Sequence, residues 1–324
     1  MPEMTRSDIE AAADVVYRTM PPTPAYAWPL LAKRAGCDVW VKHENHTPIG
    51  AFKVRGGLLY IDELARSGSD VAGVISATRG NHGQSIALAA RNAGLPAVIY
   101  VPEGNSVEKN AAMAAFGAEL VVHGRDFDEA RVACERAAQE RGLHMVRSFD
   151  RTLVRGVATY ALEFFNAAPD LDVAYVPIGM GSGICGMIAA RDALGLKTDV
   201  VGVVAEGAPT LALSFEAGRP VPTNEARTFA DGMACRVPNE DALAIIRAGA
   251  ARIVTVSDDE IADAIRFLYE DTHNLAEGAG AAAFAALMQE RTQLIGKTAG
   301  VVLSGGNIDR DQCRDVLKGA TPAV

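Results

Sequence analysis

The sequence has few cysteines, no long hydrophobic run and no leader-like N-terminus, and each absence excludes a class of protein. Its five cysteines form no C-x-x-C pair and have no histidine at zinc-site spacing, which argues against a disulfide framework or a zinc site. No window approaches about 18 consecutive apolar residues, and the first thirty residues lack a basic stretch followed by an apolar one. We therefore expect reduced thiols, a cytoplasmic protein and no membrane partner.

Positive charge is also scarce, with 31 lysines and arginines against 40 aspartates and glutamates and a net charge of -9. A nucleic acid or an anionic membrane surface needs a basic face, so a small-molecule ligand is the better expectation. The chain has 324 residues, which is enough for two domains, yet it shows no internal repeat and no Ser/Gly-rich linker. We expect an inserted small domain at 51–150, with 1–50 and 151–324 forming a large domain.

Short runs rich in β-branched residues alternate with Ala-rich amphipathic stretches along the whole chain. This alternation predicts an α/β fold, with parallel sheets flanked by crossover helices on both faces. The segment Ser7 to Glu10 reads SDIE and predicts a capping box at the start of a first helix. The predicted strands cover residues 39–42, 73–78, 97–102, 118–123, 173–178, 199–206, 252–257 and 299–304.

Three loops that follow predicted strands are rich in glycine and polar residues. They are TRGNHGQS at 78–85, IGMGSGICG at 178–186 and SGGN at 304–307. In open α/β sheets, ligands bind at the carboxyl ends of strands, where loops lead into helix N-termini. The middle loop has four glycines in eight residues from Gly179, and its backbone N–H groups and the following helix dipole suit a phosphate.

The same loop leaves a dinucleotide cofactor open. Gly181, Gly183 and Gly186 match the G-x-G-x-x-G fingerprint, and Glu206 ends the next predicted strand, where a ribose-binding acid would lie. A nicotinamide-dependent oxidoreductase is therefore one alternative, and a binding protein without catalysis is another. The oxidoreductase interpretation gives no role to Lys53, which lies in the segment TPIGAFKVRGG (47–57), or to the loops at 78–85 and 304–307.

Six motifs in order give a more specific interpretation: HENHTPIGAFKVRGG (43–57), TRGNHGQS, IGMGSG, FADG (229–232), EGAGAA (277–282) and LSGGN. This series resembles the fold type II pyridoxal-phosphate enzymes, specifically the threonine and serine dehydratase (ammonia-lyase) branch that includes serine racemase. The resemblance runs from Asp38 to Asn307. It implies a fold like the tryptophan synthase β-subunit, with two open parallel-rich sheets, pyridoxal 5'-phosphate as cofactor, and a homodimer or higher homo-oligomer.

The resemblance also implies roles for individual residues. Lys53 would form the Schiff base with the cofactor and then act as general base. Cofactor binding would involve Phe52, Asn81, Gly179, Met180, Gly181, Ser182, Gly183, Gly232, Glu277 and Ser304. The substrate would contact Thr78, Arg79, Gly80 and His82. Arg55 receives only a structural role, as a helix-face or structural charge.

The implied reaction is β-elimination from a β-hydroxy amino acid of the threonine or serine type, giving a 2-oxo acid and ammonia. Ala51 and Arg79 stand where this branch usually carries serines. An arginine could hold a carboxylate in a bidentate fork, either the α-carboxylate or one at the distal end of the substrate. It could equally point away and pair with a surface acid. Substrates such as 3-hydroxyaspartate, phenylserine or a hydroxyectoine-pathway intermediate therefore remain alternatives.

Some members of this branch bind a divalent metal. Glu206 and Thr210 match two of the ligand positions, but Ala212 stands where an aspartate would complete the set. Because magnesium and calcium prefer several oxygen ligands, including carboxylates, we expect no metal site.

Overall fold

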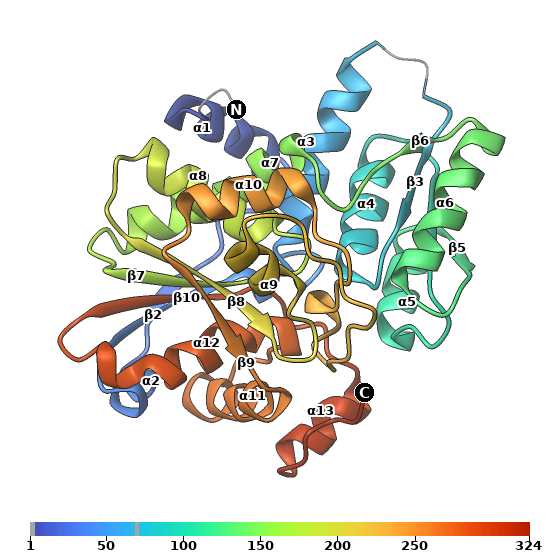
Figure 1. Ribbon diagram of the computed structural model, residues 1–324. Coiled ribbons are helices and arrows are strands. Elements are labelled where there is room, and N and C mark those ends of the chain that lie inside the picture. The colour runs from blue at the N-terminus through green and yellow to red at the C-terminus, as the bar shows by residue number, and fades with distance from the viewer. Residues whose placement is uncertain (1–3, 69–70) are drawn as a thin grey trace.

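The computed structural model describes residues 4–68 and 71–324, which build two open β-sheets (Figure 1). In the large sheet, β1 is antiparallel to β2, and all other neighbouring strands are parallel. Its strands in spatial order are β1 (Ala25–Ala27), β2 (Asp38–His43), β10 (Thr298–Leu303), β7 (Val173–Pro177), β8 (Asp199–Ala205) and β9 (Arg252–Val256). The α/β class and the parallel-rich sheets predicted from the sequence are thus confirmed.

The small sheet is entirely parallel. Its spatial order is β5 (Glu119–Val122), β4 (Ala97–Val101), β3 (Val74–Ala77) and β6 (His144–Met145). All four strands fall within the predicted insertion at 51–150, while the domain boundaries themselves stay a prediction. Figure 1 shows this sheet with α4, α5 and α6 on one side of the molecule and the large sheet on the other.

Helices cover both faces of the large sheet, and its central strands β10, β7 and β8 are buried, as is usual for parallel sheets. One apolar cluster includes residues of α2, α11 and α12, and the other includes residues of α7, α8 and α10. No helix in the described part of the chain has the length and hydropathy of a membrane span. The α-helices are α1 (Arg6–Val16), α2 (Pro29–Ala35), α3 (Lys53–Arg66), α4 (Asn81–Asn92), α5 (Val107–Ala115), α6 (Phe127–Arg141), α7 (Arg151–Ala167), α8 (Ser182–Ala193), α9 (Thr210–Ala217), α10 (Glu240–Gly249), α11 (Asp258–Thr272), α12 (Gly278–Glu290) and α13 (Arg310–Leu317); the short 3-10 helices are η1 (Glu44–His46), η2 (Asp231–Met233) and η3 (Arg291–Gln293).

The predicted capping box is wrong in position. Helix α1 is capped by Thr5, whose hydroxyl accepts from the Asp8 N–H at 3.2 Å, while the Asp8 carboxylate accepts from the Thr5 N–H at 2.8 Å. Thr5 has extended backbone angles, so it lies outside the helix, whereas Ser7 is already helical. Both segments fit the capping-box pattern, and the helix begins at the earlier one.

Helix α3 is held between two other helices by adjacent glycines. A Cβ on Gly56 would lie 2.9 Å from the backbone oxygen of Leu153 in α7, and one on Gly57 would lie 2.2 Å from the hydroxyl of Ser85 in α4. Only glycine permits this close approach on both sides. The first residue of this clamped helix is Lys53.

Candidate active site

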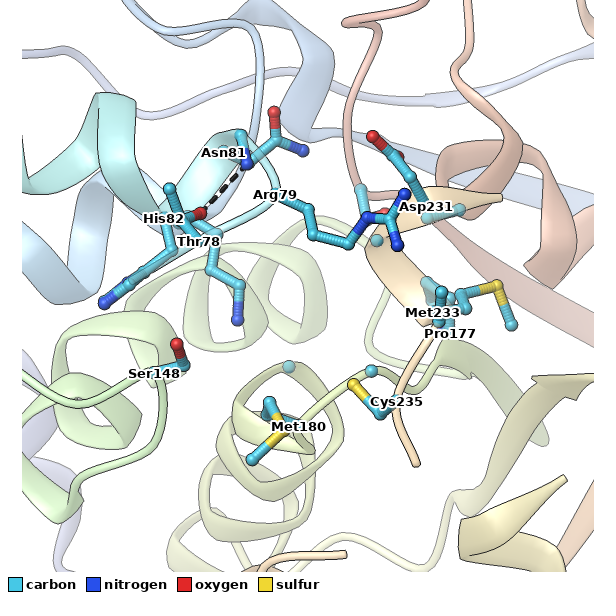
Figure 2. Close-up of a pocket in the computed structure, with 18 of the residues that line it drawn as sticks. Thr78, Arg79, Asn81, His82, Ser148, Pro177, Met180, Asp231, Met233 and Cys235 are labelled. Carbon is cyan, nitrogen blue, oxygen red and sulfur yellow. Dashed lines mark hydrogen bonds between the residues drawn. The ribbon is translucent and has the colours of Figure 1, made fainter. Parts of the chain in front are cut away.

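Every site residue predicted from the sequence lines one pocket at the carboxyl ends of the strands (Figure 2). The loops after β3, β7 and β10 contribute to it, together with the start of α3 and the segment around η2. The individual roles stay predictions, but the residues do lie together. The pocket also includes residues that were not predicted: Lys109, Phe127, Ser148, Pro177, Asp231, Met233, Ala234, Cys235 and Ala279.

Lys53 enters the pocket from the N-terminus of α3. Its Nζ donates a hydrogen bond to the Ser182 hydroxyl at 2.7 Å and lies 4.8 Å from the ring centroid of Phe52. Burial lowers the pKa of Lys53 to about 8, although the Cys235 and Cys185 thiols act in the opposite direction. A substantial fraction of this amine is therefore neutral near physiological pH, which is the form that acts as a nucleophile or a base.

The loop between β7 and α8 forms a cradle without a cationic side chain of its own. Gly181 has a φ of 98°, in the left-handed region, and caps α8, which begins at Ser182. The first N–H groups of a helix have no partner inside it, and together with the helix dipole they favour an anion. This cradle fits the phosphate of pyridoxal phosphate.

Two glycines bring opposite sides of the pocket into close contact. A Cβ on Gly179 would lie 2.2 Å from the carbonyl oxygen of Gly232. We therefore expect Gly179→Ala to push these loops apart, at a cost of about 1–3 kcal/mol, and to weaken cofactor binding about tenfold or more. Titration of the apoprotein with pyridoxal phosphate, followed by visible absorbance, measures this. Gly195→Ala, at a glycine with open space around it but a φ of 65° that strains an alanine, tests whether a loss of stability away from the pocket also weakens cofactor binding. Equal affinity of Gly179→Ala and wild type would contradict the packing argument.

The other residues predicted to bind the cofactor also suit the pyridine ring of pyridoxal phosphate. Ser304 lies directly after β10, and its hydroxyl makes no hydrogen bond within residues 4–68 and 71–324, so it is free for a ligand. Asn81 donates one amide hydrogen to Glu277 at 2.6 Å, which leaves its second amide hydrogen available. Phe52 packs edge-on against Tyr160, which fixes the position of its ring.

An ionic network that the sequence did not reveal lies beside Asn81. The Lys109 amine contacts both oxygens of Asp231, at 2.6 and 2.8 Å, and Oε2 of Glu277, at 3.1 Å. Burial alone would lower the pKa of Lys109, but the two carboxylates outweigh it and raise that pKa. Burial raises the pKa of Glu277, against the influence of Lys109. Lys109 thus ties α5 to η2 and to the start of α12.

Sequence reasoning missed Lys109 because nothing in its local pattern marks it. It lies in a short polar helix start, SVEKN, where a lysine is usually solvated. Asp231 belongs to the FADG motif, which was singled out, but only its glycine was given a role. The contact of the Lys109 stem with Gly80, where an added Cβ would lie 2.3 Å from Cδ, joins elements far apart in sequence.

The substrate-side loop is shaped by Thr78, whose hydroxyl accepts from the N–H groups of Gly80 at 2.9 Å and Gly83 at 3.2 Å. His82 is buried, and burial, reinforced by the charge of Lys53, lowers its pKa to about 3. The imidazole is therefore neutral. Its Nε2 atom has no hydrogen-bond partner in the described part of the chain, so it remains available to a ligand.

Arg79 also enters this pocket. Figure 2 shows its side chain extending toward the Asp231–Met233 segment, with Met180 and Cys235 on the other side of the pocket. Within residues 4–68 and 71–324 it forms no ion pair, and its buried Nε atom has no hydrogen-bond partner. The alternative in which Arg79 points away and pairs with a surface acid is therefore not what the structure shows.

No group of three or more histidine, cysteine, aspartate or glutamate side chains is arranged to hold a metal ion among the residues described. The expectation that the protein has no metal site stays a prediction.

Comparison with known proteins agrees with this geometry. The family model described as pyridoxal-phosphate dependent enzyme matches residues 16–305. L-threonine ammonia-lyase of Geobacter sulfurreducens is 40% identical over 280 residues, which are 86% of this chain and 69% of the relative. L-threo-3-hydroxyaspartate ammonia-lyase of Saccharomyces cerevisiae is 31% identical over 316 residues, 97% of each chain. The processed form of threonine deaminase isoform 2 from Solanum lycopersicum has a TM-score of 0.90 at 29% identity, covering 97% of this chain and 86% of the other.

These matches decide between the two cofactors left open by the glycine loop. The cofactor is pyridoxal phosphate, so the dinucleotide interpretation of Gly181, Gly183 and Gly186 is wrong. Gly186 instead serves packing, since a Cβ there would lie 3.0 Å from the backbone nitrogen of Ala158 in α7. The chain belongs to the pyridoxal-phosphate dependent enzymes, in the threonine and serine dehydratase branch of fold type II that its motifs resemble.

Proposed function

We propose that the protein is a pyridoxal-phosphate dependent ammonia-lyase that converts a β-hydroxy amino acid of the threonine or serine type to a 2-oxo acid and ammonia. The observation that carries this proposal is Lys53, an amine of lowered pKa placed between a phosphate cradle and a loop suited to a carboxylate. The names of relatives support it, including L-threonine ammonia-lyases of Geobacter sulfurreducens and Thermotoga maritima, 40% and 35% identical.

The loop from Gly179 to Gly183 would hold the cofactor phosphate, and Ser304 would face the ring nitrogen. When bound, pyridoxal phosphate joins an amine covalently through its aldehyde and withdraws electrons from the neighbouring carbon. The hydroxyl of Ser304 carries no negative charge and so would not hold the ring nitrogen protonated. This would limit electron withdrawal and would favour elimination over transamination.

The chain's own groups would carry the proton transfers. The first N–H groups of α4, at Asn81 and His82, would orient the substrate carboxylate. Lys53, neutral in part near pH 7 to 8, would take the Cα proton as general base. The β-hydroxyl then leaves with a proton as water, and one water is taken up again when the amino group is released as ammonia. Each substrate molecule therefore gives one 2-oxo acid and one ammonia.

The proposal is tested by incubating the purified holoenzyme with L-threonine and with L-serine and measuring both products. We expect 2-oxo acid and ammonia in equal amounts. A 2-oxo acid formed without free ammonia would indicate transamination, and loss of optical rotation without either product would indicate racemisation. Either result would exclude the proposed activity.

Sequence identity alone does not choose the substrate. The relative named for L-threo-3-hydroxyaspartate is 31% identical, and those named for threonine range from 30% to 40%. The substrate panel therefore also includes 3-hydroxyaspartate, phenylserine and a hydroxyectoine-pathway intermediate.

We also infer a cytoplasmic protein that works as a homodimer or higher homo-oligomer. Its cysteines support the location, because within the described residues all five are free thiols. Size-exclusion chromatography with light scattering gives the oligomeric state, and a monomer at micromolar concentration would contradict the expectation.

A further inference from the structure

Arg79 is a cation in the pocket that makes no ion pair in the part of the chain that the structure describes. Asp231 and Glu277 are the carboxylates that line the pocket, and both are bound by Lys109. We propose that Arg79 is a specificity residue that binds a second carboxylate of the substrate. The substrate class is then a β-hydroxy amino acid with a carboxylate on or beyond its β-carbon. This inference rests on the proposed function of the same pocket.

The state of the guanidinium supports a missing anionic partner. Its Nε atom is buried and has no hydrogen-bond partner in the part of the chain that the structure describes. A buried polar group without a partner is destabilising, and such groups are few in native proteins. A carboxylate would satisfy Nε together with a terminal nitrogen in a bidentate arrangement.

The other anions expected in the pocket already have places that do not involve Arg79. The glycine loop and the N-terminus of α8 would serve the cofactor phosphate. Helix α4 has twelve residues, and its first N–H groups, at Asn81 and His82, would serve the α-carboxylate. Threonine and serine bring no further anion, so with either of them Arg79 would stay unpaired. A second carboxylate on the substrate would pair with Arg79.

The charges of the lining residues lead to the same conclusion. The cations are Lys53, Arg79 and Lys109, the anions are Asp231 and Glu277, and His82 is neutral because burial lowers its pKa. Lys53 would serve the cofactor and the Cα proton, and Lys109 is paired with Asp231 and Glu277, which leaves Arg79 as the cation available to the substrate side chain. Its side chain extends toward the Asp231–Met233 segment and away from Met180, which belongs to the phosphate cradle (Figure 2).

The test compares wild type, Arg79→Ser and Arg79→Lys holoenzymes with 3-hydroxyaspartate, L-threonine and L-serine. We expect Arg79→Ser to lower kcat/KM for 3-hydroxyaspartate about 10- to 100-fold, the range for loss of a charge-assisted hydrogen bond. The values for threonine and serine, which have no second carboxylate, should fall at least about threefold less than the value for 3-hydroxyaspartate, and Arg79→Lys should restore part of the loss. Arg310→Ser, at an exposed arginine of α13, is the matched control.

A binding measurement separates the inference from the activity. Calorimetric titration of the wild-type holoenzyme should show that succinate binds about tenfold tighter than butyrate, with the difference lost in Arg79→Ser. An equal fall of kcat/KM for all three amino acids in Arg79→Ser would overturn the proposal and assign Arg79 to the α-carboxylate. If no amino acid gives a 2-oxo acid while the succinate preference holds, the proposed function fails and the carboxylate site stands.

Discussion

Replacement of Lys53 by alanine is expected to lower kcat for the elimination by about four orders of magnitude. The variant loses both the amine that attaches the cofactor and the base that removes the Cα proton, and base catalysis alone contributes about 10²–10⁴-fold. Borohydride reduction followed by intact-mass measurement checks the first role: wild type should retain one covalently bound cofactor, and Lys53→Ala none. The rate under saturating substrate checks the second.

Lys33→Ala, at an exposed lysine, is the control and should retain both the mass increase and the rate. Because Lys53 contacts Ser182 and Phe52 without an ion pair in the described chain, Lys53→Ala and wild type, both free of cofactor, should unfold at nearly the same urea concentration. If the variant still fixes one cofactor on a different lysine and keeps its rate, the assignment of Lys53 is wrong.

Replacement of Arg55 by methionine is expected to lower the free energy of unfolding by about 3–5 kcal/mol. The guanidinium is fully buried and binds the Glu44 carboxylate at 2.7 and 2.9 Å and the Glu163 carboxylate at 2.6 and 2.8 Å. Without it, Lys42 is the one cation left for these two buried carboxylates among the described residues, and the remaining hydrogen bonds come from the neutral groups of Thr23 and Tyr17. Methionine has a similar length but cannot neutralise either carboxylate. Urea denaturation followed by circular dichroism gives the change.

A second variant separates charge from packing. Adding Glu44→Gln to Arg55→Met removes one unpaired carboxylate and should recover part of the lost stability, while Arg310→Met at the exposed site should change it by less than about 0.5 kcal/mol. If Arg55→Met lowers the free energy of unfolding by less than about 1 kcal/mol, water must replace the guanidinium. The ion pairs of Arg55 with Glu44 and Glu163 would then have little importance for stability.

The strands could be predicted because each contains a short run rich in β-branched residues, whether it is buried like β7 or largely accessible like β5. All eight predicted strands form, while β1, with three residues, and β6, with two, are too short to leave one. The pocket could be predicted in part because each loop follows a strand whose carboxyl end faces the same edge. The role of Lys53 could be predicted only from the series of motifs along the chain, since its own segment does not distinguish it from an ordinary solvated lysine.

The ionic partners could not be predicted, because they come from distant segments. Arg55 was expected to be structural, but its burial depends on Glu44 after β2 and Glu163 in α7. Lys109 likewise meets Asp231 and Glu277 only when α5 packs near η2 and α12. A charged side chain in a sequence shows its sign but not its partner. The unpaired state of Arg79 is visible only once those partners are placed.

The two glycines after Lys53 also limit how this site could be transplanted into another protein. Gly56 and Gly57 allow α7 and α4 to approach α3 more closely than any side chain permits. Packing from these two directions therefore sets the position of the Lys53 backbone at the start of α3. Copying the motif FKVRGG onto another helix would transfer the amine without the surfaces that aim it. A designer who wanted this nucleophile would have to move three helices together, and the smallest portable unit is that helix trio rather than the six-residue motif.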